Sequence, residues 1–327
     1  MEEKDSMMKK EDFRIVFMGT PEFAVCILDK LVQDNYSIVG VITAPDKPAG
    51  RGQQVHQSDV KKYAIEKQLN ILQPTNLKDE TFIHQLKDLR ADLFVVVAFR
   101  MLPEVVWAMP PKGTINLHAS LLPNYRGAAP INWAVINGDK ETGVTSFFIE
   151  KEIDTGKIIE RSKLLIGENE TVGELHDRLM NLGAEVIEST VQKIIKGEAI
   201  GIEQLKLAEG ELKIAPKIFK QDCKIDWNQN IDIVHNFIRG LSPYPAAWCS
   251  LKNKIKGDEK SFKIFLSEKT NTPSNGQSSL KKEIDGIYFP CKDYYLKITE
   301  IQMEGKRRMH FKEFLAGNTV SDWEIID

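Results

Sequence analysis

GTINLHASLLPNYRGAAPINWAV, residues 113–135, and IEKEIDTGKII, residues 149–159, are the stretches of this sequence that decide its fold and function. The first begins as an extended segment in which Asn116 and His118 are two residues apart, so their side chains leave the same face of a strand. A turn-rich loop follows, and Asp154 comes at the next obvious turn. An amide, an imidazole and a carboxylate near one loop can bind a polar centre and move protons.

Strands and helices alternate on the N-terminal side of this stretch. Arg14–Met18, Ile38–Thr43 and Leu93–Phe99 are short apolar runs typical of buried strands, with segments of helical spacing between them. This order predicts an α/β fold with a doubly wound, mainly parallel sheet, of which Gly113–Leu117 is a further strand. Ligands of such sheets bind beyond the carboxyl ends of the strands, which is where we expect the Asn/His pair and its loop.

The turn after the first strand, Gly19-Thr20-Pro21, has one glycine where a dinucleotide fingerprint needs three. A nicotinamide dehydrogenase is therefore disfavoured. Val144–Ile149 and Lys157–Leu165 are extended runs on either side of an Asp-Thr-Gly turn, which predicts a hairpin that continues the sheet. Thr171–Ile195 has the apolar spacing of a long amphipathic helix.

Between that helix and Pro216 the regular apolar spacing is lost, and we place the domain boundary in this segment. Short alternating apolar runs separated by polar loops then predict one short helix, Ile231–Arg239, and a small antiparallel barrel. We predict a first domain over residues 12–200, a linker over 201–217 and a second domain over 218–327. We expect Asn271–Ser279, rich in Ser, Asn, Thr and Gly, to be an exposed loop.

Composition indicates an ordinary globular protein: 327 residues, 42% hydrophobic and 28% charged, with a formal net charge of −3. No global positive field indicates a nucleic-acid partner, although Lys and Arg slightly outnumber Asp and Glu after Ile218. The four cysteines have neither metal-ligand spacing nor a disulfide framework, so we expect no metal and a cytoplasmic location. The longest apolar run is too short for a bilayer, so we expect no membrane partner.

The residues alone leave structural roles open. An Asn/His pair at a strand end is often structural, and Asp before Thr-Gly is a common turn residue. Lys47 and Arg51 lie in a Pro/Gly loop that could be a plain connection or could reach a phosphate backbone. The cluster Lys306, Arg307 and Arg308 is open to the same two interpretations, a solvated edge or a binding surface.

Several motifs resemble those of the methionyl-tRNA formyltransferase family, from about Phe13 to Gly317. In the first domain they are IVFMGTPEFAV, TAPDKPAGRGQ, INLHASLLPNYRGAAPINWA and EKEIDTGKI. In the second they are APKI, KIDWNQ, IRGLSPYPAAW and GKRRMHFKEFLAG. The central motif is common to folate-dependent formyltransferases. The Pro-Ala-Gly-Arg-Gly loop and the second domain are what narrow the resemblance to the tRNA enzymes.

The resemblance implies a Rossmann-like formyltransferase domain followed by an OB-like barrel that binds tRNA. It implies formyl transfer from 10-formyltetrahydrofolate to the methionine of initiator methionyl-tRNA. We expect the protein to be a monomer. It assigns catalysis to Asn116, His118 and Asp154. It assigns folate binding to Ser120, Leu121, Leu122 and Pro123, and tRNA binding to Arg51, with Lys47, Lys306, Arg307 and Arg308 as further candidates.

Two departures from the family pattern stand out. Gln53 and Gln54 follow the Gly-Arg-Gly sequence where lysines are common, and Phe99-Arg100 replaces a common Tyr-Gly. We therefore expect the barrel to supply more of the contacts that bind tRNA. We also expect the folate pocket to have an altered shape. The remaining alternatives are a formyltransferase acting on a small amine, a formyl-folate hydrolase, and an RNA-binding module without activity.

Overall fold

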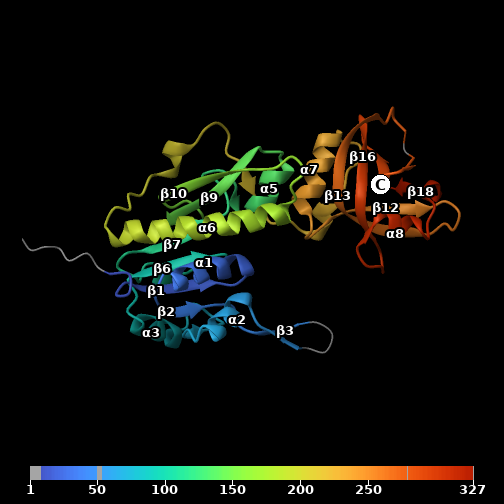
Figure 1. Cartoon of the computed structure of the whole chain (residues 1–327). Coiled ribbons are helices and arrows are strands. Elements are labelled where there is room, and N and C mark those ends of the chain that lie inside the picture. The colour runs from blue at the N-terminus through green and yellow to red at the C-terminus, as the bar shows by residue number, and fades with distance from the viewer. Residues whose placement is uncertain (1–8, 50–53, 278, 327) are drawn as a thin grey trace, which may run out of the picture. The chain divides into compact units, whose positions relative to one another are not determined.

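The computed structural model describes residues 9–49, 54–277 and 279–326. The chain forms two compact units (Figure 1). The first contains Met1–Gly127, Gly143–Leu164 and Asp177–Lys213, and the second contains Ala128–Thr142, Leu165–His176 and Ile214–Asp327. The first unit carries the α/β pattern and the second carries the antiparallel strands. The predicted boundaries at 12–200, 201–217 and 218–327 stay a prediction.

A seven-stranded sheet of order β10-β9-β7-β6-β1-β2-β5 organises the first unit. β1 pairs in parallel with β2 and β6, β6 pairs in parallel with β7, and β9 runs antiparallel to β7. The strands are β1 (Arg14–Gly19), β2 (Ser37–Ile42), β5 (Ile71–Leu72), β6 (Leu93–Val97), β7 (Thr114–His118), β9 (Glu141–Phe148) and β10 (Ile158–Leu165). The predicted parallel sheet and its terminal hairpin are both confirmed.

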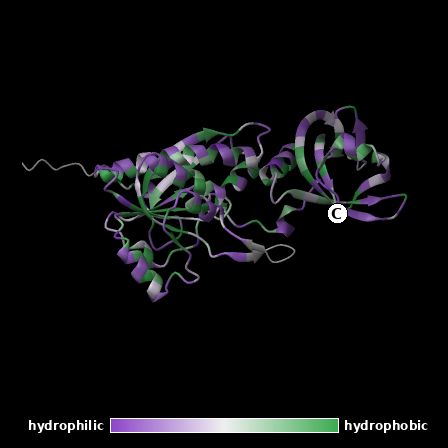
Figure 2. Ribbon diagram, turned by 60° about the horizontal axis from the view of Figure 1, so that its bottom comes forward, coloured by the Kyte–Doolittle hydropathy of each residue, from purple (hydrophilic) through white to green (hydrophobic). Residues whose placement is uncertain are grey.

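Helices cover both faces of this sheet (Figure 1). They are α1 (Glu22–Gln33), α2 (Asp59–Glu66), α3 (Glu80–Asp88), α4 (Glu104–Trp107) and α6 (Val172–Ile195). Alternate residues of β1 serve the two faces, and Val16 and Met18 pack with Phe82 of α3 in one apolar cluster. On the other face, Leu117 lies so close to Gly183 of α6 that a Cβ there would be 2.7 Å from it. The central strands are accordingly continuous apolar runs, which appear mostly green in Figure 2.

Two short elements lie where a loop and a linker were predicted. β3 (Lys47–Ala49) pairs with β4 (Gln54–His56) as an antiparallel ribbon. A single turn of 3-10 helix, η1 (Gln204–Leu207), follows α6. Neither has the apolar periodicity by which longer elements are detected in a sequence.

The second unit is a curled antiparallel sheet of order β14-β15-β16-β13-β12-β18, with β17 paired to β16. A bridge between Ser279 and Glu324 connects the two ends of this order. Its elements are α5 (Pro130–Ile136), β11 (Ile214–Ala215), η2 (Lys220–Cys223), α7 (Ile231–Leu241), β12 (Ala247–Asn253), β13 (Glu259–Pro273), β14 (Lys281–Glu283), β15 (Gly286–Pro290), β16 (Tyr294–Met303), β17 (Met309–His310), α8 (Phe311–Leu315), η3 (Val320–Asp322) and β18 (Trp323–Ile326). The predicted fold class, a doubly wound sheet followed by a small OB-like barrel, is confirmed, with the barrel present as this curled antiparallel sheet.

One local prediction in this unit was wrong in part, although residues 271–273 and 275–277 are exposed as expected. The loop expected over Asn271–Ser279 begins later, because β13 continues to Pro273, which pairs with Tyr294 of β16. Ser274 is fully buried, and its backbone N–H donates to Asp293 O at 3.0 Å. Polar composition indicated an exposed loop, but the long partner strand extends the pairing.

A buried imidazole makes the second unit sensitive to acid. His235 of α7 is 1% exposed and contacts Ser267 Oγ at 2.9 Å, and burial lowers its pKa from 6.5 to about 4. Because the unfolded chain binds this proton more readily, stability is complete above about pH 6.5 and falls as the pH drops toward 4. We expect a loss of about 3 kcal/mol in the free energy of unfolding across this range from His235.

Urea denaturation at pH 6.5 and pH 4.5 measures this loss. His235→Gln removes the titrating group, so its stability should depend less on pH over this interval than that of the wild type. His84→Gln, at an exposed position of α3, provides the matched control and should keep the wild-type dependence. An equal dependence in wild type and His235→Gln would contradict the assignment.

Candidate active site

The carboxyl end of β7 carries the predicted amide and imidazole. Asn116 and His118 leave the face of the sheet opposite to Leu117, as alternation along a strand requires. Asn116 is partly exposed, and its side chain makes no hydrogen bond to any residue that the structure describes. Its amide N–H group is therefore available to a ligand at the edge where such sheets bind them.

His118 is held in one tautomer by a buried hydrogen bond. Its ring is 7% exposed, and Nε2 lies 2.7 Å from the backbone oxygen of Tyr125. A carbonyl oxygen can only accept, so Nε2 carries the proton and donates it. Nδ1 is then the nitrogen that can take up a further proton, and it faces Asp154 Oδ2 at 3.9 Å. This distance is too long for a hydrogen bond, and the contact becomes an ion pair when the imidazole is protonated.

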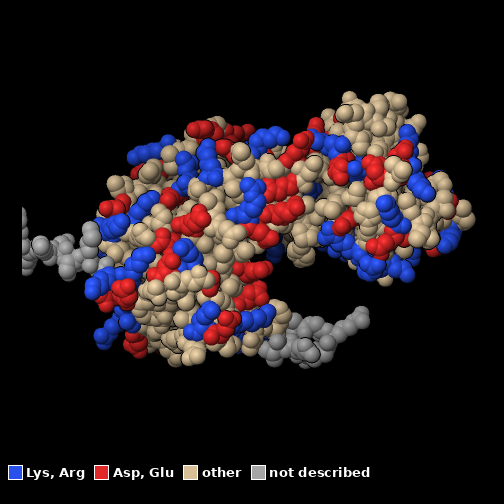
Figure 3. All heavy atoms as spheres, viewed as in Figure 1, with Lys and Arg blue, Asp and Glu red and all other residues tan. Residues whose placement is uncertain are grey.

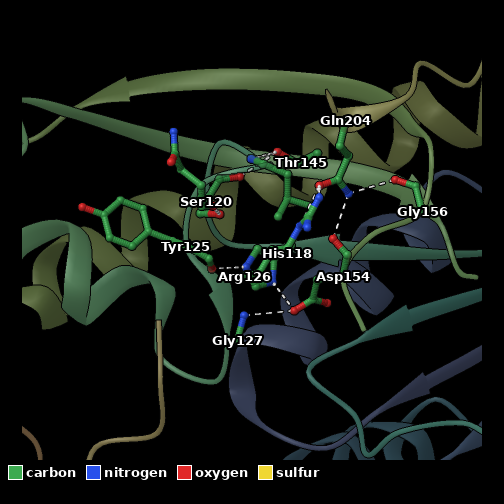
Figure 4. A network of polar contacts seen from close by, with 11 residues as sticks. His118, Ser120, Tyr125, Arg126, Gly127, Thr145, Asp154, Gly156 and Gln204 are labelled. Atoms are coloured by element: carbon green, nitrogen blue, oxygen red, sulfur yellow. Dashed lines mark hydrogen bonds and ion pairs between the residues drawn. The ribbon is translucent and has the colours of Figure 1, made fainter. Parts of the chain in front are cut away.

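Asp154 lies in the turn between β9 and β10, with its carboxylate directed to the loop after β7 (Figure 4). Oδ2 accepts a hydrogen bond from the backbone N–H of Gly127 at 3.1 Å. The backbone of Asp154 is left-handed, with φ +55°. At Gly156, two residues on, a Cβ would overlap the carbonyl oxygen of Phe148, so only glycine fits there.

A second polar network, which sequence reasoning missed, surrounds this turn (Figure 4). Gln204 of η1 is 3% exposed and donates from Nε2 to the backbone oxygens of Asp154 at 2.8 Å and Gly156 at 2.9 Å. Its Oε1 accepts from Arg126 Nε at 3.0 Å and Nη2 at 2.6 Å. No local motif signals Gln204, because its partners lie at least 48 residues away in the sequence.

The segment predicted to bind folate, Ser120 to Pro123, is fixed by internal hydrogen bonds. Ser120 Oγ donates to Asn124 O at 2.7 Å, so this hydroxyl is already engaged. Thr145 Oγ1 donates to Ser120 O at 2.6 Å and accepts from the N–H of Leu122 at 3.1 Å. Leu122 and Pro123, joined by a cis peptide bond, are buried, whereas Leu121 is partly exposed. Thr145 was not predicted from the sequence, because nothing local distinguishes it within β9.

Arg100, which together with Phe99 replaces the Tyr-Gly common in the family, makes contacts with the segment before α3. The Arg100 guanidinium lies 5.5 Å from the centre of the Phe99 ring. It also donates to the backbone oxygens of Thr75, at 3.0 Å, and Pro74. The side chain thus ties the segment after β6 to the segment before α3.

The residues predicted to bind tRNA differ in their exposure and in their ion pairs. Arg51 lies outside the described residues, and Lys47, at the start of β3, is exposed. Arg307 is paired with Glu313, and Arg308 Nε donates to Glu300 Oε2 at 2.6 Å while its guanidinium lies 4.4 Å from the Phe265 ring. Lys306 is exposed between β16 and β17. Charges of both signs are interspersed over the face of each unit in Figure 3.

The described residues contain neither a candidate metal site nor a membrane-spanning helix. In the part of the chain that the structure describes, no group of three or more His, Cys, Asp or Glu side chains could hold a metal ion. Among the same residues, no helix is both long and apolar enough to cross a bilayer.

Comparisons with known proteins match both units. A family model described as formyl transferase matches residues 13–191, and one described as formyl transferase, C-terminal domain, matches residues 217–319. The methionyl-tRNA formyltransferase of Bacteroides fragilis is 52% identical over 320 residues, which cover 95% of this chain and 96% of the relative. That of Flavobacterium johnsoniae is 53% identical over 316 residues, covering 95% and 98%.

Solved structures share the fold at lower identity. The N-formyltransferase from Helicobacter canadensis, in complex with folinic acid and dTDP-3-aminofucose, has a TM-score of 0.61 at 19% identity. The match covers 91% of this chain and all of that one. HypX from Aquifex aeolicus, in complex with tetrahydrofolic acid, has a TM-score of 0.62 at 15% identity and covers 92% of this chain and 46% of its own.

Proposed function

The chain belongs to the methionyl-tRNA formyltransferase family, and we propose that Asn116, His118 and Asp154 carry out its reaction. In this reaction a formyl group passes from 10-formyltetrahydrofolate to the amino group of methionine on initiator tRNA, the step that prepares it for translation initiation. The predicted enzyme and co-substrate are confirmed by relatives above 50% identity that span almost the whole chain, among them the two named above. The observation that carries the residue assignment is the contact of His118 with Asp154 beside the Asn116 amide, which bonds to no side chain or backbone group among the described residues.

Asn116 donates its amide N–H to the formyl oxygen. During transfer the attacking amine forms a new N–C bond, the bond to the folate nitrogen breaks, and the formyl oxygen gains negative charge in between. A donor already directed at that oxygen stabilises the charge without having to reorganise. The side chain fits this role because none of the described residues competes for it.

His118 moves the proton, and Asp154 stabilises its charged form. The amine loses one proton as it attacks, and the folate nitrogen needs one as it leaves. Nδ1 takes the first and returns the second, because Nε2 is committed to Tyr125 O. Asp154, 3.9 Å away and fixed by the Gly127 N–H, is placed to form an ion pair with the imidazolium between the two transfers.

For the folate co-substrate, we propose that the segment Ser120 to Pro123 supplies shape rather than polar contacts. Its serine hydroxyl and the Leu122 N–H already have protein partners, while partly exposed Leu121 offers apolar surface. The donor that fits a polar centre is the Asn116 amide, because the Nε2–H of His118 is already given to Tyr125 O. Folate binding by this segment should therefore respond more to Leu121→Ala than to Ser120→Ala, as measured by the KM for 10-formyltetrahydrofolate.

We propose that Arg51 and Lys47 contact the tRNA from the first unit, and that Lys306, Arg307 and Arg308 do so from the second. Phosphate contacts dominate such binding and weaken with salt. Arg307→Gln with Arg308→Gln should raise the KM for tRNA with little change in kcat, and should flatten the salt dependence of kcat/KM by about one unit of log–log slope per lost contact. Steady-state kinetics at salt concentrations from about 50 mM to about 200 mM measure both the KM for tRNA and this salt dependence.

Lys254→Gln with Lys256→Gln provides the control, since both lysines are exposed in the same unit and the charge change is equal. An effect of equal size in this control would show a general charge effect and contradict a local contact. Arg51→Ala should likewise impair use of tRNA, and unchanged tRNA kinetics would contradict its assignment.

One assay tests the proposed function as a whole. The protein is incubated with 10-formyltetrahydrofolate and either methionyl initiator tRNA or a small amine, such as an amino sugar nucleotide. Formyl-methionyl-tRNA is the expected product. Formylation of the small amine alone, or folate turnover without an acceptor, would point to the alternative transferase or to a hydrolase.

We propose further that the protein works in the cytoplasm as a monomer. All four of its cysteines are free, which suits a reducing compartment. Sedimentation velocity should give a single species near 37.1 kDa, and a dimer would contradict the second part of this proposal.

A further inference from the structure

We propose that Gln204 is a positioning residue that holds the Asp154 carboxylate against the loop after β7, so that the segment after α6 forms part of the active site. The inference rests on the proposed function, because it assigns Gln204 a role in the reaction of Asp154 and His118. Gln204 lies within the predicted linker, and its side chain contacts neither the His118 imidazole nor the Asp154 carboxylate directly.

The burial pattern of η1 is the first observation. Gln204 is 3% exposed, whereas its neighbour Leu205 is 77% exposed. Side-chain hydrophobicity alone would give the opposite arrangement. A buried amide beside an exposed leucine indicates that the polar contacts of Gln204 help to fix this turn within the first unit, together with Leu207, which packs against the cluster of Leu122, Phe147 and Ile158.

The hydrogen bonds of Gln204 connect the two segments that form the Asp154–Gly127 contact. Its two N–H donors are used by Asp154 O and Gly156 O, on one side of the contact. Its Oε1 is used by the Arg126 guanidinium, from the residue directly before Gly127, on the other side. One side chain therefore sets the spacing between the Asp154 turn and the backbone N–H that holds the Asp154 carboxylate.

Backbone conformation explains why this turn needs support. Asp154 has φ +55° and Gly127 has φ +124°, both in regions that ordinary L-residues seldom adopt. Such conformations persist where the surrounding structure over-determines them. Without the amide of Gln204, two backbone oxygens of the turn lose a donor, and the Asp154 carboxylate is free to move away from His118.

Three variants separate this role from a merely structural one. Gln204→Leu removes all contacts of the amide at similar size. Gln204→Glu keeps an oxygen for Arg126 and replaces the donor to the backbone oxygens of Asp154 and Gly156 by an acceptor. Gln85→Glu, at an exposed position of α3, is the matched control for the added charge. We expect kcat to fall ~10²-fold in both Gln204 variants, with KM for both substrates nearly unchanged, since displacement of a reacting group by about 1 Å has an effect of this size.

A double-mutant cycle gives the decisive measurement. Asp154→Asn removes the carboxylate but keeps the backbone oxygen that Gln204 contacts. If Gln204 acts through the carboxylate, Gln204→Leu should change kcat by less than about threefold in the Asp154→Asn background, instead of ~10²-fold. If the fold-changes in kcat of Gln204→Leu and Asp154→Asn multiply in the double variant, Gln204 has an independent structural role and the inference is overturned.

Thermal unfolding of each variant is recorded alongside, so that loss of folded protein is not mistaken for loss of positioning. If Gln204→Leu does not fold, Gln204→Glu in the two backgrounds gives the same cycle. If wild type formylates methionyl-tRNA and both Gln204 variants keep full kcat, the inference fails while the proposed function stands. If wild type shows no formylation, the proposed function itself has failed.

Discussion

Asn116→Ala should lower kcat for formylation by ~10²–10³, the usual effect of removing one donor from a developing oxyanion. The KM for tRNA should change little, because the donor acts on the formyl oxygen and the tRNA is held elsewhere. The side chain makes no hydrogen bond to the described residues, so its removal leaves no protein group without a partner. Single-turnover formylation with saturating substrates measures the effect directly.

The control for this variant is Asn70→Ala, which removes an exposed amide of the same unit that donates to Val39 O. It should leave kcat within about twofold of wild type, in keeping with the small effects of most surface substitutions. If kcat is unchanged in Asn116→Ala, Asn116 is not a catalytic residue. A rise confined to KM for 10-formyltetrahydrofolate would make it a binding group instead.

His118→Gln should have the second large effect, a fall in kcat of ~10²–10⁴, typical of losing a general acid–base group. The glutamine amide can still donate toward Tyr125 O, so the loop after β7 keeps its contact. What the variant lacks is a nitrogen that can take up a proton while facing Asp154. Single-turnover rates again give the effect, with tRNA binding measured separately by filter retention.

Asp154→Asn tests the partner of His118. It should lower kcat less than His118→Gln, because the imidazole can still accept a proton but its cation is less stabilised. Combining the two substitutions should give no more than the His118→Gln effect. If the double variant were slower by the product of the two, the residues would act independently, contrary to the proposed relay. His84→Gln, exposed on α3, should match wild type.

The fold was predictable where its signals are local. The apolar runs of β1, β2 and β6 and the helical spacing of α6 each lie within a short window of sequence. Helix α6 begins one residue after the predicted Thr171, since Glu174 Oε2 accepts from the Thr171 N–H at 2.8 Å in a capping arrangement. β3, β4 and η1 were not predicted, because they are short and depend on contacts rather than on periodicity.

The site was predictable in part, for the same reason. Asn116 and His118 share one strand, so alternation alone places them on one face. The left-handed backbone at Asp154 and its contact with the Gly127 N–H depend on segments 27 residues apart, and the Gln204 contacts span up to 78. Nothing in a local window encodes such pairings. That these residues act on substrate stays a prediction.

The closure of the second unit bears on how the protein behaves in concentrated solution. Open sheet edges can recruit strands from other molecules, and short, charged or covered edges prevent this. Here one outer strand, β14, is only three residues long, all of them charged, and Ser279, just before it, forms a bridge with Glu324 at the other end of the sheet. Overproduced protein should therefore resist strand-mediated aggregation, and substitutions that lengthen β14 with apolar residues should promote it.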